Sequence, residues 1–170
     1  KLLNFLKNIL GAENNEIYKV DGMLNLGDLM MLYKSDKREL KYEGFTPRIS
    51  SYFREEEDFF KTISERDVFL HHPFYSFSSV SEFIAQSAED PNVYAIKLTL
   101  YRTSGDSPII HSLIEAAENG KQVTAVVELK ARFDEENNII WAKSLENAGV
   151  HVVYGVSGLK THCKMALVVR

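Results

Sequence analysis

The sequence predicts a mixed α/β fold, in which a mostly parallel sheet lies between helices and a mainly helical segment precedes it. From residue 67 onward, apolar strand-like runs alternate with helix-like runs, a pattern typical of parallel strands connected by helices. Of the 170 residues, 45% are hydrophobic and 26% are charged, which is ordinary for a globular protein. Glycines follow two of the expected helices, at positions where helices commonly end.

The N-terminal part of the chain is expected to be mainly helical. Residues 1–10 carry apolar side chains at helical spacing, and Gly11 is a plausible stop. Residues 20–33 are apolar at mixed helical spacing. The polar stretch 35–54 indicates a linker, and residues 55–64 predict a short charged helix.

These patterns predict two domains. We expect residues 1–48 to be the C-terminal tail of a preceding helical domain with its linker, and residues 49–170 to form a second domain. The sequence begins at Lys1 and stops at Arg170 within a strand-like run, so both ends look cut. We therefore expect a fragment of a longer protein, with the second domain truncated at its C-terminal end.

The second domain is predicted to contain four strands and the helices between them. The strands are expected at residues 93–101, 122–129, 150–154 and 165–169, and the helices at residues 78–88, 107–118 and 138–147. Gly120 and Gly149 follow two of these helices as expected C-terminal caps.

Four basic residues are predicted to meet at one edge of this sheet. Arg102 and Arg132 each fall just past the C-terminal end of a strand, the edge where α/β sheets bind ligands. His162 and Lys164 stand two apart at the start of the last run, so the period of a strand places them on one side. All four meet only if the last strand is antiparallel to its neighbour.

This combination of residue types suits phosphoryl transfer. Histidine is a nucleophile toward phosphorus, lysine neutralises oxygen charge, and arginine binds phosphate oxygens with two parallel hydrogen bonds. The commoner interpretation of His162 alone is a structural histidine, and Lys164, Arg102 and Arg132 taken singly are surface residues. Cys163 is expected to face away from His162 and to be buried.

Composition excludes several classes of function. The net charge of -4 argues against non-specific binding of nucleic acid. The apolar runs are shorter than a membrane span, and the single cysteine fits a reducing compartment. The sequence has no P-loop, dinucleotide fingerprint or zinc-ligand spacing.

Four motifs follow one another along the chain. They are RDVFLHHPFYSFS at residues 66–78, AIKLTLYRT at 95–103, GKQVTAVVELKARFDEE at 120–136 and GVSGLKTHCKMALVVR at 155–170. In this order they resemble the bacterial, histidine-phosphorylating polyphosphate kinase family. Residues 12–50 look like the end of that family's helical second domain and the crossing into its third.

The resemblance implies a fold and a set of site residues. The family's third domain is similar to half of a phospholipase D, with a mixed sheet between helices. The autophosphorylated histidine of the family falls on His162. The resemblance implies Mg²⁺ as the cofactor. The two arginines that the family associates with phosphate and magnesium fall on Arg102 and Arg132. We expect both to contact phosphate, because guanidinium has no lone pair for a metal.

The resemblance also implies an activity and partners. The family transfers the γ-phosphate of ATP reversibly to polyphosphate through phosphohistidine, and it works as a homo-oligomer. The implied partners are ATP or ADP and polyphosphate, without nucleic acid. The expected location is the cytoplasm, with peripheral association at the inner face of the membrane. The fragment alone is expected to be inactive, since the fourth domain, with nucleotide contacts and a further histidine, follows Arg170.

Two alternatives stay open at this point. A phospholipase D-like phosphodiesterase would use the same histidine, but its longer motif has an aspartate five residues after the lysine, where this chain has Val169. This difference argues against cleavage of phosphodiesters. A non-catalytic module would bind polyanions without modification of His162.

Overall fold

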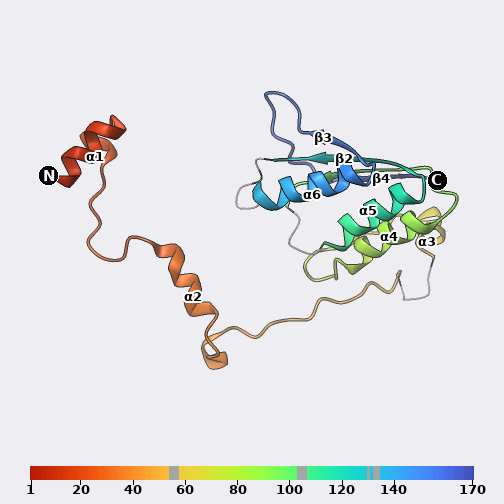
Figure 1. Ribbon diagram of the computed structural model, residues 1–170. Coiled ribbons are helices and arrows are strands. Elements are labelled where there is room, and N and C mark those ends of the chain that lie inside the picture. The colour runs from red at the N-terminus through yellow and green to blue at the C-terminus, as the bar shows by residue number, and fades with distance from the viewer. Residues whose placement is uncertain (54–57, 103–106, 130, 132–134) are drawn as a thin grey trace. The chain divides into compact units, whose positions relative to one another are not determined.

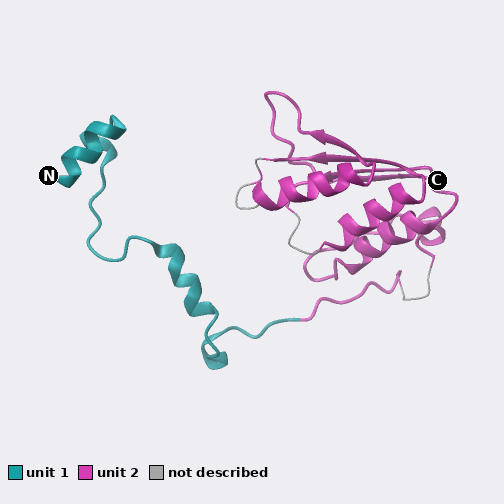
Figure 2. Cartoon of the chain, viewed as in Figure 1, with its two compact units in different colours: residues 1–45 teal, residues 46–170 magenta. Residues whose placement is uncertain are grey.

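The computed structural model describes residues 1–53, 58–102, 107–129, 131 and 135–170 (Figure 1). The chain divides into two compact units, residues 1–45 and residues 46–170 (Figure 2). The expected division into domains after residue 48 concerns the longer protein and stays a prediction.

The unit of residues 1–45 consists of short helices. They are α1 (Leu2–Leu10), η1 (Asn14–Glu16), η2 (Leu26–Leu29), α2 (Met30–Tyr33) and η3 (Arg38–Leu40). The helix predicted over residues 1–10 is confirmed, and it ends at Gly11 with a φ of 62°, a conformation that glycine adopts without strain. None of these five elements has a buried residue.

The unit of residues 46–170 alternates helices with strands. Its elements are α3 (Phe59–Glu65), α4 (Ser78–Glu89), β1 (Ala95–Leu100), α5 (Pro108–Glu118), β2 (Gln122–Val127), α6 (Glu135–Asn147), β3 (His151–Tyr154) and β4 (Ala166–Val169). The predicted mixed α/β class is confirmed. Across the described residues, no helix has the length and apolar character needed to cross a bilayer.

The sheet has the strand order β3-β2-β1-β4. β1 pairs in parallel with β2, and β2 in parallel with β3, whereas β4 runs antiparallel to β1 with Ala166 opposite Leu98. The sheet is therefore mostly parallel with one antiparallel member, as the sequence predicted.

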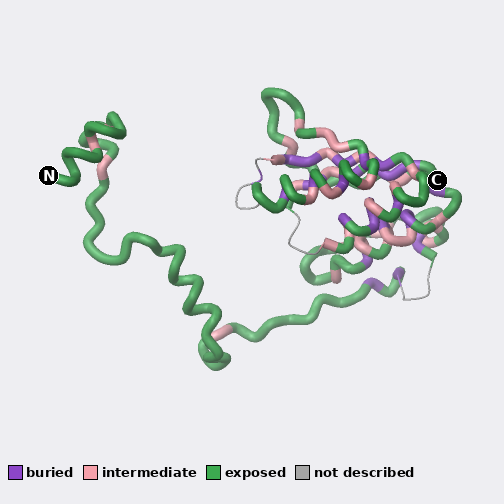
Figure 3. Tube along the Cα trace, viewed as in Figure 1, coloured by how far each residue is buried: buried purple, intermediate pink, exposed green. Residues whose placement is uncertain are grey.

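The core lies between one face of the sheet and the helices α4, α5 and α6 (Figure 3). Alternate strand residues are buried, because successive side chains of a strand point to opposite faces. The sheet residues of the core are Ile96, Leu98, Leu100, Val123, Ala125 and Val127. The helices α4, α5 and α6 add Ile84, Ala88, Ile110, Leu113, Ala116, Ala142 and Leu145.

Two glycines turn the chain from helix into strand. Gly120 after α5 and Gly149 after α6 have φ values of 79° and 87°, in the left-handed region. After α5, the Lys121 amide donates to the Ala116 carbonyl at 3.0 Å, the long hydrogen bond of a glycine-capped helix end. Both predicted caps are thus confirmed.

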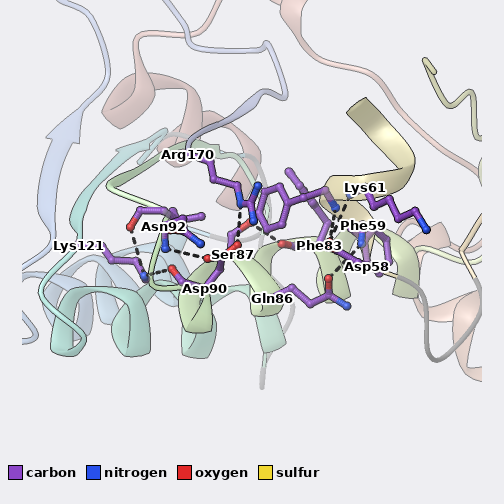
Figure 4. A network of polar contacts seen from close by, with 12 residues as sticks. Asp58, Phe59, Lys61, Phe83, Gln86, Ser87, Asp90, Asn92, Lys121 and Arg170 are labelled. Atoms are coloured by element: carbon purple, nitrogen blue, oxygen red, sulfur yellow. Dashed lines mark hydrogen bonds and ion pairs between the residues drawn. The ribbon is translucent and has the colours of Figure 1, made fainter. Parts of the chain in front are cut away.

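A polar network around Asp90 joins three distant parts of the chain (Figure 4). The Asp90 carboxylate accepts hydrogen bonds from the Asn92 amide and from Arg170 Nε, each at 2.8 Å. Lys121 Nζ donates to the backbone carbonyls of Asp90 and Val93. The end of α4, the start of β2 and the end of β4 are therefore tied together. The Asn92 amide first, and Arg170 second, lower the pKa of the Asp90 carboxyl.

The lowered pKa of Asp90 predicts a pH dependence of stability. Because the folded-state pKa lies below the ordinary value of 3.8, ionised Asp90 stabilises the fold at higher pH, and this contribution is lost as the pH falls through the lowered pKa. We expect D90N to lower the urea midpoint of the chain near neutral pH, and the difference from wild type to shrink below pH 3.8.

The control for this experiment is D36N, which changes an exposed aspartate outside the network. Its urea midpoint should follow that of wild type at every pH. A deficit of D90N that does not change with pH would contradict the prediction.

Candidate functional site

The antiparallel pairing of β4 with β1 brings the segment before β4 beside the end of β1. The Thr99 amide donates to the Met165 carbonyl at 2.9 Å. The Thr99 hydroxyl donates to the Cys163 carbonyl and accepts from the Met165 amide, both at 2.9 Å. One side chain of β1 thus holds the backbone that follows His162. The predicted meeting of His162 and Lys164 with the end of β1 is confirmed.

The ring of Tyr101 is the point where these side chains meet. The imidazole of His162 packs edge-on against it, with ring centroids 5.1 Å apart and an interplanar angle of 74°. Lys164 Nζ lies 4.0 Å from the ring centroid, a cation–π distance. The guanidinium carbon of Arg102 and Lys160 Nζ lie 5.5 Å and 5.8 Å from the same centroid. Three cations and one imidazole therefore surround a single aromatic ring.

Lys164 is also held by the backbone beside His162. Its Nζ donates a hydrogen bond of 2.6 Å to the His162 carbonyl oxygen. This bond and the contact with Tyr101 keep the ammonium group close to the imidazole, although both side chains are exposed. A ligand in this place can therefore reach both groups.

A cavity of about 740 Å³ opens at this edge of the sheet. That volume is within the range of small-molecule sites. Its polar lining includes His72, Arg102, His162 and Lys164, and its apolar lining includes Phe77, Val80, Leu98, Leu100, Ile109 and Met165. The Nδ1–H of His72 donates to the Tyr75 carbonyl at 2.9 Å, so this ring is held in place as well. The cavity thus combines an apolar lining with several basic groups.

The buried side chain of Asn138 connects the ends of two strands. Asn138 is 1% exposed and belongs to α6. Its Nδ2 donates to the Tyr101 carbonyl at 2.7 Å and to the Glu128 carbonyl at 3.0 Å. Neither Tyr101 nor Asn138 was predicted as part of the site. Tyr101 stands directly before Arg102 at a strand end, which is a signal that could have marked it, whereas no local signal marked Asn138.

The predictions for two other residues, Arg132 and Cys163, have different outcomes. Arg132 lies outside the described residues, so its place at this edge stays a prediction. The expectation of a buried Cys163 is wrong, because its side chain is exposed. β4 begins only at Ala166, so strand alternation does not yet apply to residues 162–165. The roles assigned to His162 and Lys164 also stay predictions.

Among the described residues, no three histidine, cysteine, aspartate or glutamate side chains lie close enough together to hold a metal ion. Arg102 lies at the cavity, but its guanidinium has no lone pair to donate to a metal. Its chemistry suits phosphate oxygens instead.

The fold and this basic edge define an α/β domain suited to phosphate chemistry. A family model described as polyphosphate kinase C-terminal domain 1 matches residues 58–170. The chain belongs to the polyphosphate kinase family.

Individual relatives agree with this assignment. The chain is 56% identical to a polyphosphate kinase of Mycobacterium marinum over 99% of its own length and 23% of that protein. It is 55% identical to a polyphosphate kinase of Halalkalibacterium halodurans, over 99% of this chain and 24% of that protein. The crystal structure of polyphosphate kinase from Porphyromonas gingivalis is similar, with a TM-score of 0.79 and 31% sequence identity. The match covers 98% of this chain and 25% of that one. The chain spans about a quarter of the length of these relatives.

The two hydrogen bonds of Asn138 predict a large effect of its removal on stability. N138A would leave the carbonyls of Tyr101 and Glu128 without these buried donors, which costs roughly 2–4 kcal/mol of unfolding free energy. Urea unfolding of the chain measures this loss. N147A changes an exposed asparagine at the end of the same helix and should stay within about 0.5 kcal/mol of wild type. Equal stability of the two variants would contradict the prediction.

Proposed function

We propose that His162 accepts the γ-phosphoryl group of ATP and passes it to polyphosphate, in a reversible reaction through phosphohistidine. The observation that carries the proposal is the group of His162, Lys164 and Arg102 around the Tyr101 ring, at the mouth of a cavity. Membership of the polyphosphate kinase family supports the choice of substrates.

The proposed reaction has two steps. A ring nitrogen of His162 attacks the γ-phosphorus in line, and a P–N bond forms as the bond to the bridging oxygen breaks and ADP leaves. A terminal oxygen of polyphosphate then attacks the same phosphorus. The P–N bond breaks, and its electron pair returns to the imidazole. The reverse sequence forms ATP from ADP and polyphosphate.

The cations around Tyr101 have a role in both steps. Lys164 lies beside the nucleophile and would neutralise charge on the oxygens of the transferring group. Arg102 would bind phosphate oxygens through parallel hydrogen bonds, and the family resemblance assigns the same role to Arg132. Because Lys164 and Arg102 lie beside the Tyr101 ring before the ligand binds, little reorganisation of these two side chains is needed at the transition state.

Mg²⁺ is proposed as the cofactor, bound together with the nucleotide. Magnesium in kinase sites is held by substrate phosphates together with one or two carboxylates, and here it would reduce the negative charge of the nucleotide phosphates.

Further properties of the longer protein are part of this proposal. We propose ATP or ADP and polyphosphate as partners, without nucleic acid, and a homo-oligomer in the cytoplasm. With a net charge of -4, this chain attracts a polyanion only through a local basic region, which the edge around Tyr101 provides. Association with the inner membrane face, and inactivity of the chain on its own, stay predictions.

The assignment of His162 predicts a covalent adduct. In the full-length protein incubated with ATP and Mg²⁺, we expect an acid-labile phosphate on His162 by mass spectrometry. H162A should lose both the adduct and polyphosphate synthesis. H151A is the matched control, because His151 is exposed at the start of β3, at the opposite edge of the sheet, and should keep both. Synthesis that continues in H162A, with no adduct in wild type, would overturn the proposal.

The assignment of Arg102 predicts a loss of transition-state stabilisation. R102Q removes the guanidinium beside Tyr101 and should raise the activation free energy by roughly 2–4 kcal/mol, similar to the loss of one preorganised donor. The measurement is kcat/KM of the full-length protein for ATP. R38Q, which changes an exposed arginine of η3, is the control and should retain the wild-type value. A wild-type value for R102Q would exclude the role.

A further inference from the structure

Glu128 is a buried acidic residue at the edge of the sheet that carries Arg102, His162 and Lys164. It follows β2 directly and is 6% exposed. Among the described residues, it is the one ionisable side chain in the buried class. A carboxylate taken out of water is costly unless hydrogen bonds compensate for the loss. Its position within a phosphate-handling region therefore needs an explanation that the proposed reaction does not supply.

The carboxylate of Glu128 holds the backbone next to the nucleophile. Glu128 Oε2 accepts a hydrogen bond of 2.8 Å from the amide of Thr161, the residue immediately before His162. A side-chain carbon at Gly155 would lie 4.0 Å from the same oxygen. The loop of residues 155–161 therefore has both of its ends beside this carboxylate.

The position of Glu128 is itself set by the fold. Its amide donates to the Leu100 carbonyl at 3.0 Å, and its carbonyl accepts from Asn138 Nδ2 at 3.0 Å. Asn138 also donates to the Tyr101 carbonyl, and the Tyr101 ring touches the imidazole of His162. Glu128 is thus bonded through its backbone to β1 and α6, and through its side chain to the loop that leads into His162.

We propose that Glu128 is a positioning residue for His162, an inference that rests on the proposed function of that histidine. The carboxylate fixes the amide of Thr161, and so determines where the imidazole stands relative to Tyr101 and Lys164. A fixed acceptor for the Thr161 amide suits an anchor for a glycine-containing loop. A misplacement of about 1 Å at a reacting atom slows a reaction by about 100-fold.

The test uses the full-length protein and three substitutions of Glu128. E128A removes the acceptor and should slow the single-turnover phosphorylation of His162 by about 100-fold, with the affinity for ATP changed by less than about threefold. E128Q retains an acceptor oxygen at the same place and should recover most of the rate. E128D withdraws the carboxylate by one methylene and should fall between the two. If E128A fails to fold, the comparison of E128Q with E128D decides the question.

Hydrogen exchange of peptides that cover residues 155–162 provides a readout that does not depend on activity. Amide protection should be lost in E128A and kept in E128Q. E118A, which changes an exposed glutamate at the end of α5, is the control and should match wild type in rate and exchange.

The outcomes separate this proposal from the proposed function. No phosphohistidine in the wild-type protein would overturn both. Phosphorylation of wild type, E128A and E128D at equal rates would overturn only the role of Glu128. If E128Q were as slow as E128A while its loop stayed protected, the charge of the carboxylate would matter instead of its hold on Thr161, and positioning would again be excluded.

Discussion

The site depends on the pairing of one strand, β4, against the direction of its neighbour. β1 runs toward the edge of the sheet where β4 begins, so the residues after β1 lie beside the residues before β4. The hydrogen bonds of Thr99 to Cys163 and Met165 fix this register. Had β4 been parallel to β1, the segment before it would lie at the opposite edge, far from the other basic side chains.

The gathering of positive charge at this edge is local. The chain as a whole has a net charge of -4, yet three cations lie within 6 Å of the Tyr101 ring centroid. Like charges placed together repel one another, and the electron-rich face of the ring offsets part of that repulsion. An anion that enters the cavity meets cations already in position, which favours binding of phosphate groups over binding of neutral ligands.

Two buried polar side chains tie the strand ends of the site to the loop before His162. Asn138 joins the backbone ends of β1 and β2, and Glu128 joins the end of β2 to the loop before His162. Each of these groups is buried and hydrogen-bonded, so moving one end would leave a donor or acceptor without its partner. Four distant parts of the chain are therefore held in one geometry by two side chains.

The sequence by itself determined the α/β class, the glycine caps after α5 and α6, and the candidates His162, Lys164 and Arg102 near the end of β1. These features depend on local periodicity, on the conformational freedom of glycine, and on which residue types bind phosphate. Only the tertiary structure decided that Tyr101 is the meeting point of the cations, that Cys163 is exposed, and that Asn138 and Glu128 support the site. The hydrogen-bond partners of Asn138, Glu128 and Cys163 lie between 10 and 64 residues away along the chain, and no local pattern encodes a contact over such a separation.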